Sequence, residues 1–142
     1  MSFKNVILAC ASVVTLSTPA FAQDLNEFQV YVSNLHGSLE NIAAARTYLE
    51  SQSLWNAEYE KQLDRAKDAV MMSSYSLGQW ILPGISYRDA RNRLSAFCDY
   101  NFEAELAWIH MNRLLGEEQN QRPEWQDLFK KAKKDLPMPC GD

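Results

Sequence analysis

The chain of 142 residues lacks the short motifs that accompany the commonest enzyme chemistries outside the cytoplasm. It contains no Gly-x-Ser-x-Gly elbow, no His-Glu-x-x-His pair and no Cys-x-x-Cys, so nothing indicates a serine hydrolase, a helical zinc protease or a haem attachment site. We therefore expect a protein that is not an enzyme and that holds no cofactor.

Histidine is also scarce. The two histidines, His36 and His110, lie on different predicted helices without a ligand-like cluster, and we expect structural roles for them. Met71, Met72, His110 and Met111 could together suit Cu(I). Methionines at such positions more often fill a core, so we expect no metal site.

No apolar run reaches the roughly 20 residues that span a bilayer. The longest, from Val6 to Leu16, follows Lys4 and precedes Ala20-Phe21-Ala22, the layout of a cleavable secretory signal. We expect residues 1 to 22 to be this signal and 23 to 142 to form the mature protein, periplasmic or secreted. The alternative is a lipoprotein signal, with Cys10 as the lipid-bearing residue.

Basic residues are outnumbered by acidic ones, 14 to 18. Removal of residues 1 to 22 takes away one lysine and no carboxylate, which makes the mature part more acidic still. Nucleic acid is therefore not an expected partner. The only basic run holds four lysines between 130 and 134, and we interpret it as a solvated face near a helix C-terminus. A docking patch for an acidic partner is the alternative.

Three cysteines occur, of which Cys10 would leave with the signal. Cys98 and Cys140 are then an even pair in an oxidising compartment, which predicts a disulfide. In the chain-entropy model, closing a loop of this length stabilises the fold by about 4 kcal/mol. The bridge would tie down the C-terminal tail. A catalytic or metal-binding thiol pair is the less favoured alternative.

Apolar residues recur at steps of three and four throughout the mature part, and no strand pattern competes. The first such stripe predicts a helix over 24 to 50. A second helix should begin after a turn near Ser51 or Ser53 and end at Pro83-Gly84. The two stripes are Leu25, Phe28, Val32, Leu35, Leu39, Ile42, Ala45 and Leu49, then Leu63, Ala66, Val70, Ser73, Leu77 and Ile81.

Ser86-Tyr87-Arg88-Asp89 has the form of a capping box and predicts the start of a third helix. The broad apolar face of this helix predicts a central position in the bundle. After Gly116 and a wholly polar segment, Pro123 suits the first turn of a fourth helix. The sequence thus predicts an all-α, four-helix-bundle-like single domain with one disulfide.

Polar residues within this pattern have mainly structural interpretations. Asn101 lies in the apolar stripe of the third helix and would need a buried partner there. Carboxylates gather on the second and third helices, and we interpret them as a solvated polar face rather than as an acid and base pair. They are Glu58, Glu60, Asp64, Asp99, Glu103 and Glu105.

The end of the second helix mixes aromatic, small and turn-forming residues. Such residue types dominate interface energetics when they are exposed. We therefore single out Tyr75, Gln79, Trp80, Tyr87 and Arg88 as candidate partner-binding residues. Trp80 has a second interpretation, in which it closes the end of the bundle.

Four short elements carry a family resemblance: Tyr75-Ser76-Leu77-Gly78, Phe97-Cys98, Arg122-Pro123-Glu124-Trp125 and Pro139-Cys140. In this order they resemble small periplasmic immunity proteins that protect bacteria from type VI secreted peptidoglycan hydrolases. The resemblance covers about half of the mature chain. The family commonly has a second cysteine pair, which this chain lacks, and the helix over 24 to 50 has no counterpart.

Tyr87-Arg88-Asp89 near Cys98 is similar to a pattern in secreted helical lysozyme inhibitors. Both resemblances imply a rigid bundle that binds and blocks a cell-wall hydrolase or toxin. The alternative is a structural or accessory envelope factor, chaperone-like or secretion-associated, that self-associates or forms a homodimer through its first helix.

Overall fold

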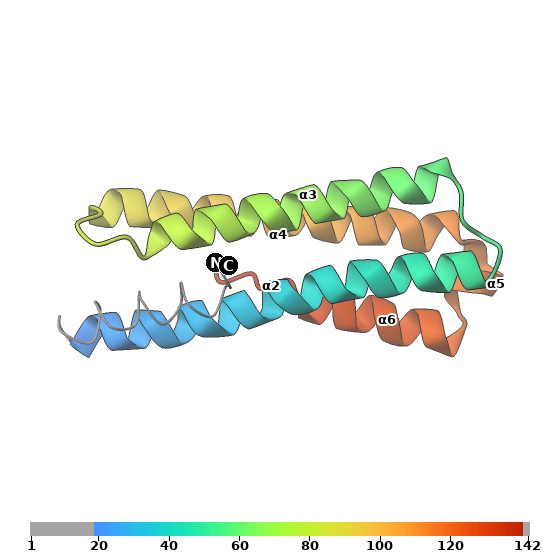
Figure 1. Cartoon of the computed structure of the whole chain (residues 1–142), viewed down its shortest axis with the longest axis horizontal. Coiled ribbons are helices and arrows are strands. Elements are labelled where there is room, and N and C mark those ends of the chain that lie inside the picture. Colours follow the sequence, from blue (N-terminus) through green and yellow to red (C-terminus); the bar gives the residue numbers. More distant parts are fainter. Residues whose placement is uncertain (1–18, 141–142) are drawn as a thin grey trace.

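A computed structural model describes residues 19 to 140, with side chains from Leu25 onward. This part of the chain is helical, without strands, and so confirms the expected all-α class. Figure 1 shows the long helices running side by side along the longest axis of the molecule. The elements are α2 (Pro19–Ser51), α3 (Ala57–Trp80), α4 (Tyr87–Leu114), α5 (Gly116–Asn120) and α6 (Pro123–Lys134).

Residues 1 to 18 lie outside the described part, and with them Cys10 and most of the predicted signal. The signal and its cleavage after Ala22 therefore stay predictions. Within the described residues, no helix combines the length and the apolar character that crossing a membrane requires.

Side-chain caps set where the helices begin. The Ser86 hydroxyl accepts a hydrogen bond from the Asp89 amide at 3.1 Å, as the capping pattern predicts, and Pro123 occupies the first turn of α6. The turn predicted near Ser51 or Ser53 is present, at residues 52 and 53. The helix that follows it is capped by Asn56, whose side-chain oxygen accepts from the amides of Glu58 and Tyr59.

Two details of the connections were not predicted. Ser53 adopts φ 58° in the turn between α2 and α3, and two further residues separate it from the cap at Asn56. The polar segment after Gly116 forms α5, a single short helix, instead of an irregular link. Gly116 itself has φ 75°, a left-handed conformation that glycine adopts without strain, and it allows the chain to turn from α4 into α5.

The predicted stripes form the core. On α2 the stripe residues are buried except for Val32 and Leu39, which are half-buried against the core. On α3 and α4 the buried set includes several small residues, which allow the two helices to lie close together. The small buried residues are Ala66, Ala69, Ser73, Ser76, Ala104 and Ala107.

The fourth helix spans only part of the bundle. α6 packs against α2 and α4, and Figure 1 shows that it covers the half of the molecule nearer the α2–α3 turn. In the other half, which contains the α3–α4 turn, the chain continues as an extended tail from Asp135 to Cys140. Trp125 anchors α6: its ring packs beside Trp108 and Tyr48, and its indole N–H donates to Asn112 at 2.8 Å.

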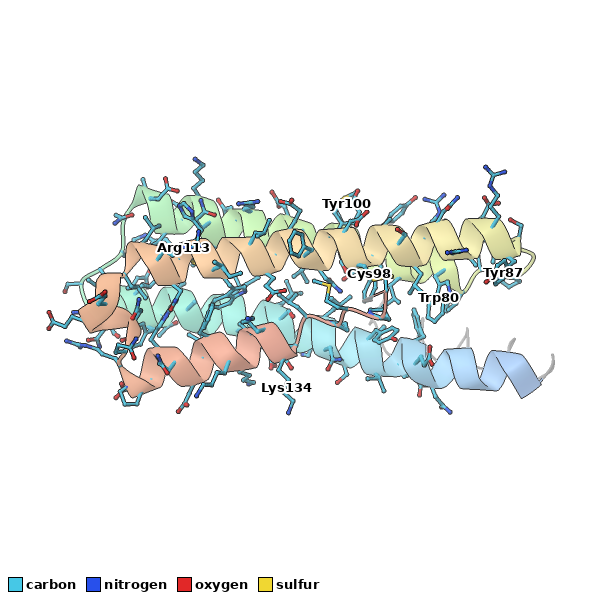
Figure 2. All side chains as sticks on the ribbon, turned by 180° about the vertical axis from the view of Figure 1, so that it is seen from behind. Trp80, Tyr87, Cys98, Tyr100, Arg113 and Lys134 are labelled. Atoms are coloured by element: carbon cyan, nitrogen blue, oxygen red, sulfur yellow. A yellow bond between two sulfur atoms is a disulfide. The ribbon has the colours of Figure 1, made fainter. Side chains whose placement is uncertain are left out.

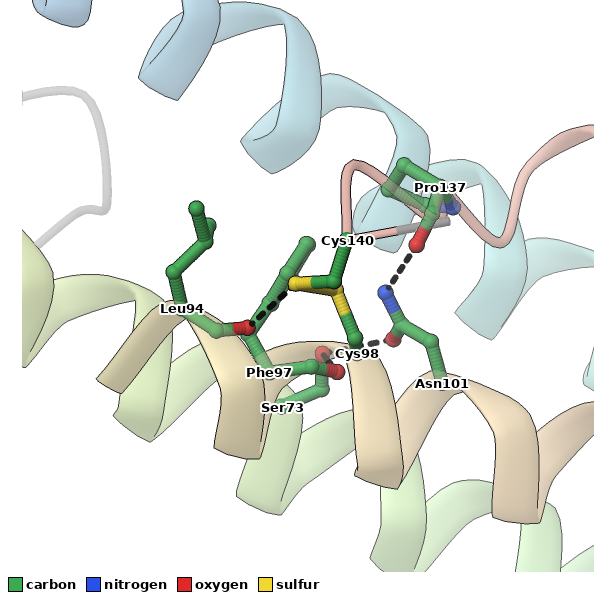
Figure 3. The surroundings of a disulfide bond; sticks show 7 residues. All are labelled: Ser73, Leu94, Phe97, Cys98, Asn101, Pro137 and Cys140. Atoms are coloured by element: carbon green, nitrogen blue, oxygen red, sulfur yellow. Dashed lines mark hydrogen bonds between the residues drawn. A yellow bond between two sulfur atoms is a disulfide. The ribbon is translucent and has the colours of Figure 1, made fainter. Parts of the chain in front are cut away.

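Cys98 and Cys140 form the expected disulfide, with their Cα atoms 6.2 Å apart. The bridge joins the middle of α4 to the end of the tail (Figure 3). The Cys140 sulfur also lies 3.2 Å from the Leu94 carbonyl oxygen. Because a disulfide sulfur carries no proton, this is a sulfur–oxygen contact and not a hydrogen bond. The predicted tie on the C-terminal tail is thus confirmed.

Candidate functional site

The candidate binding residues lie at the end of the bundle where α3 turns into α4. Tyr75 and Tyr87 are 60% and 83% exposed, and Arg88 is exposed as well. Gln79 and Trp80 are half-buried. Figure 2 shows Trp80 and Tyr87 near the same end of the molecule, with Arg113 near the other. The five residues share this region without forming one continuous surface.

Trp80 packs inside the bundle more than it faces the solvent. Its ring centroid lies 6.3 Å from that of Tyr31, and the Tyr31 ring lies 5.4 Å from that of Phe97, which is fully buried. The Tyr31 pKa is raised, mainly because burial disfavours the phenolate and secondarily because Glu27 is nearby. These three rings close the half of the bundle that α6 does not reach, in agreement with the packing interpretation of Trp80.

Sequence reasoning missed two residues of the exposed surface. Met71 is 55% exposed and Met72 is 44% exposed, although methionine more often fills a core. The apolar stripe already contained the signal, because Ala66, Val70, Ser73 and Leu77 leave both methionines off the buried face. Together with Tyr75, one turn further along, they form what we call the α3 patch: Met71, Met72 and Tyr75.

The α3 patch lies on a section of helix that a buried polar relay fixes in place (Figure 3). The Ser73 hydroxyl donates to Asn101 Oδ1 at 2.6 Å, and Asn101 Nδ2 donates to the Pro137 carbonyl at 2.8 Å. Both side chains are fully buried. One amide thus connects α3, α4 and the tail, which confirms that Asn101 has a buried partner.

A second set of contacts seats the start of the tail on α2. The Ser38 hydroxyl donates to the Asp135 carbonyl at 2.7 Å, and Asn41 Nδ2 donates to the Asp135 carboxylate at 2.9 Å. A side chain at Gly37 would place its Cβ 2.8 Å from that carboxylate. Glycine at position 37 therefore leaves room for the Asp135 side chain in the position where Asn41 binds it.

Three of the carboxylates considered for acid and base chemistry, Glu58, Glu103 and Glu105, have cationic or amide partners. Glu103 accepts from Arg65 at 2.7 Å, and Glu105 lies 3.3 Å from Lys133. The Glu58 pKa is lowered, chiefly by the hydrogen bond from Gln62 and to a lesser extent by Lys61 and His110. These partners favour the charged carboxylates of a polar face.

A surface depression lies along the N-terminal half of α3, lined by Ala57, Glu60, Lys61, Asp64, Arg65 and Asp68. Its lining comes from one helix and is almost entirely charged, so it is not a closed binding cleft of the kind small ligands occupy.

The residues considered for copper are dispersed. Met111 is fully buried, whereas His110 is half exposed and its Nε2 lies 3.5 Å from Glu58. Met72 is about 21 Å further along α3 than Glu58, at 1.5 Å per residue. Among residues 19 to 140, no three or more histidine, cysteine, aspartate or glutamate side chains gather in a metal-binding arrangement.

The lysine run lies in the last turns of α6. Lys133 pairs with Glu105 and lies 5.7 Å from the centre of the Phe129 ring. Lys130, Lys131 and Lys134 are exposed. Their position at a helix C-terminus is where positive charge is favoured, which supports the interpretation as a solvated face.

Comparison with known proteins adds no relative: no family model, no curated protein and no solved structure matches this chain.

Proposed function

We propose that this protein is an extracytoplasmic binding protein that docks on another protein through the α3 patch. The observation that carries the proposal is the exposure of Met71, Met72 and Tyr75 within two turns of one helix, each between 44% and 60%. Large apolar side chains placed singly on a surface need no explanation, but a group of them on a rigid helix is typical of an interaction site.

Rigidity supports this function. The patch alternates along α3 with residues locked in the core, since Val70, Ser73 and Leu77 are all buried. Ser73 is further held by Asn101, and the tail behind Asn101 is held by the disulfide. A preorganised surface loses little conformational entropy when it binds, which is the physical requirement for an inhibitor.

The most specific form of the proposal is inhibition of a cell-wall hydrolase, as an immunity protein or an inhibitor. The resemblance of Phe97-Cys98 and Pro139-Cys140 to periplasmic immunity proteins supports this form, and these are the residues that anchor the tail. Tyr75, which begins the first element of the resemblance, lies in the patch.

The competing proposal, self-association through the first helix, needs an apolar stripe on α2 that remains free. Leu35, Ile42 and Leu49 of that stripe are buried within the chain itself, at 8% exposure or less. The stripe is therefore used for folding, and we favour binding to a different protein.

A photo-crosslinking amino acid at position 75 tests the proposal inside cells. The expected result is one dominant adduct, with the partner identified by mass spectrometry as a cell-wall hydrolase or toxin. The same amino acid at position 114 is the matched control. Leu114 is also exposed, at 42%, but it is the last residue of α4 and lies at the end of the bundle away from the α3–α4 turn. Equal adducts from both positions, or an adduct of this protein with itself, would contradict the proposal.

A further inference from the structure

The α3–α4 turn combines exposed apolar side chains with a local excess of positive charge. We call residues 81 to 87 the hairpin tip. Within it Leu82 is 45% exposed, Tyr87 is 83% exposed, and Ile81 and Ile85 are half-buried. Figure 1 shows this turn at one end of the long axis, where the first turns of α2 reach about as far.

Three arginines follow the tip directly: Arg88, Arg91 and Arg93, all exposed. None of them takes part in the ion pairs found among the described residues. Between residues 69 and 98, Asp89 is the only acidic residue, and the nearest acidic residue on α2 with a described side chain is Glu27. A chain with a formal charge of −4 thus concentrates positive charge at this end.

This arrangement does not help α4 to form. Cations in the first turns of a helix oppose the helix dipole, and here Asp89 alone provides the acidic residue of the first turn. Arg88 and Arg91 lie in the first two turns. Their presence therefore suggests a role outside the stability of the helix.

We propose that the hairpin tip docks on an anionic phospholipid surface, with Leu82 and Tyr87 entering the interface and the three arginines contacting lipid phosphates. Tyrosine is favoured at the depth of lipid headgroups, and exposed aliphatic groups enter the boundary of the acyl chains. Along the axis of α4, Arg88, Arg91 and Arg93 lie about 1.5, 6 and 9 Å beyond Tyr87. This range matches the depth of a headgroup layer.

An acidic protein fits the tip less well. A standard protein interface engages roughly 20 to 30 residues on each side, whereas the tip and its arginines offer about a dozen at the end of two helices. A bilayer needs no complementary shape. The tip begins after the end of α3 at Trp80, about 7.5 Å of axial rise beyond Tyr75, and contains none of the α3 patch residues. This inference therefore does not depend on the proposed function.

Sedimentation with lipid vesicles tests the inference. The protein is purified from the cell fraction that holds it, with its natural N-terminus, and mixed with vesicles of phosphatidylcholine alone or with phosphatidylglycerol added. We expect at least tenfold tighter binding to the anionic vesicles. Replacing Arg88, Arg91 and Arg93 by glutamine should weaken this binding roughly fivefold for each arginine. The change Leu82→Ser removes the apolar side chain without changing the charge of the tip, and it should also weaken binding.

The matched control replaces Lys130, Lys131 and Lys134 by glutamine, which removes the same number of positive charges from another exposed surface. The control should bind anionic vesicles as the unmodified protein does, and circular dichroism should show every variant folded. The inference is wrong if the protein does not prefer anionic vesicles, if the lysine variant loses as much binding as the arginine variant, or if Leu82→Ser has no effect.

Discussion

Substitution of Asn101 by alanine should destabilise the protein more than any surface substitution, because one buried amide joins three segments. The change removes the acceptor of the Ser73 hydroxyl and the donor to the Pro137 carbonyl, at 2.6 and 2.8 Å. A buried polar group left without a partner costs about 1 to 3 kcal/mol. The Ser73 hydroxyl can turn toward the Phe97 carbonyl, 3.5 Å away. The loss of its Asn101 acceptor therefore contributes less to the destabilisation than the unpaired Pro137 carbonyl does.

We therefore expect Asn101→Ala to lower the free energy of unfolding by about 3 kcal/mol relative to Asn92→Ala. Asn92 is exposed on the same helix, so it is a matched control. Both substitutions gain the same helix propensity, about 0.6 kcal/mol. The difference between them reports the lost hydrogen bonds together with the small cavity that alanine leaves at the buried position.

The assay is urea unfolding of the oxidised protein, followed by the fluorescence of the buried Trp108 and Trp125. A double-mutant cycle with Ser73→Ala should give a coupling energy of about 1 to 2 kcal/mol. If Asn101→Ala and Asn92→Ala differ by less than about 1 kcal/mol, the relay is not an important link between the tail and the bundle.

Three further predictions concern the seat of the tail, the disulfide and pH. Gly37→Ala should destabilise the protein, because its Cβ would lie 2.8 Å from an Asp135 oxygen that accepts a hydrogen bond from Asn41. The Cβ of Gly78→Ala would meet nothing within 4 Å, so this control should stabilise the protein by about 0.5 to 1 kcal/mol. Replacing both Cys98 and Cys140 by serine should lower the free energy of unfolding in urea by up to about 4 kcal/mol. The helical circular dichroism signal should stay intact, because Trp125 still anchors α6, and loss of this signal would contradict the prediction. Because the folded-state Glu58 pKa is lowered, its contribution to stability is present above the unfolded pKa and is lost as pH falls through the folded pKa. Thermal melts at neutral and acidic pH should thus show a smaller acid destabilisation for Glu58→Gln, and an unchanged pH profile would count against the interaction.

Most of the fold could be predicted from the sequence, because it rests on local signals. The three-and-four periodicity marked the buried faces, Ser86 marked one helix start, and Pro123 marked another. The start of α3 could not be predicted in this way. Ser53 and Asn56 are both good caps by residue type, and only the left-handed backbone of Ser53 excludes it from that role.

The candidate surface was only partly predictable, since exposure depends on which helices neighbour each face. The stripe of α3 indicates that Met71 and Met72 point away from the core. It does not indicate whether another helix covers them, and α6, which packs against α2 and α4, does not. The sequence also does not show that α6 has only 12 residues and that a tail replaces its second half. The partners of Asn101 were unpredictable for the same reason, because one of them, the Pro137 carbonyl, belongs to that tail.

The tail also links stability to the proposed function. Its contacts with Ser38, Asn41 and Asn101 all lie within the chain, and they hold the half of the bundle that carries the α3 patch. We expect that loosening the tail weakens partner binding even when the patch residues are unchanged, because the patch then loses its preorganised geometry.

Hydrolase inhibition tests the central claim most directly. Peptidoglycan is digested by the hydrolase captured through position 75, with increasing amounts of the protein, and the clearing of turbidity is followed. The account predicts that an equimolar amount of the protein stops clearing, that Met71→Asp with Tyr75→Asp abolishes the effect, and that Leu114→Asp at the other end of α4 retains it. Equal inhibition by the patch variant and by the Leu114 variant, or no inhibition by the unmodified protein, would contradict the account.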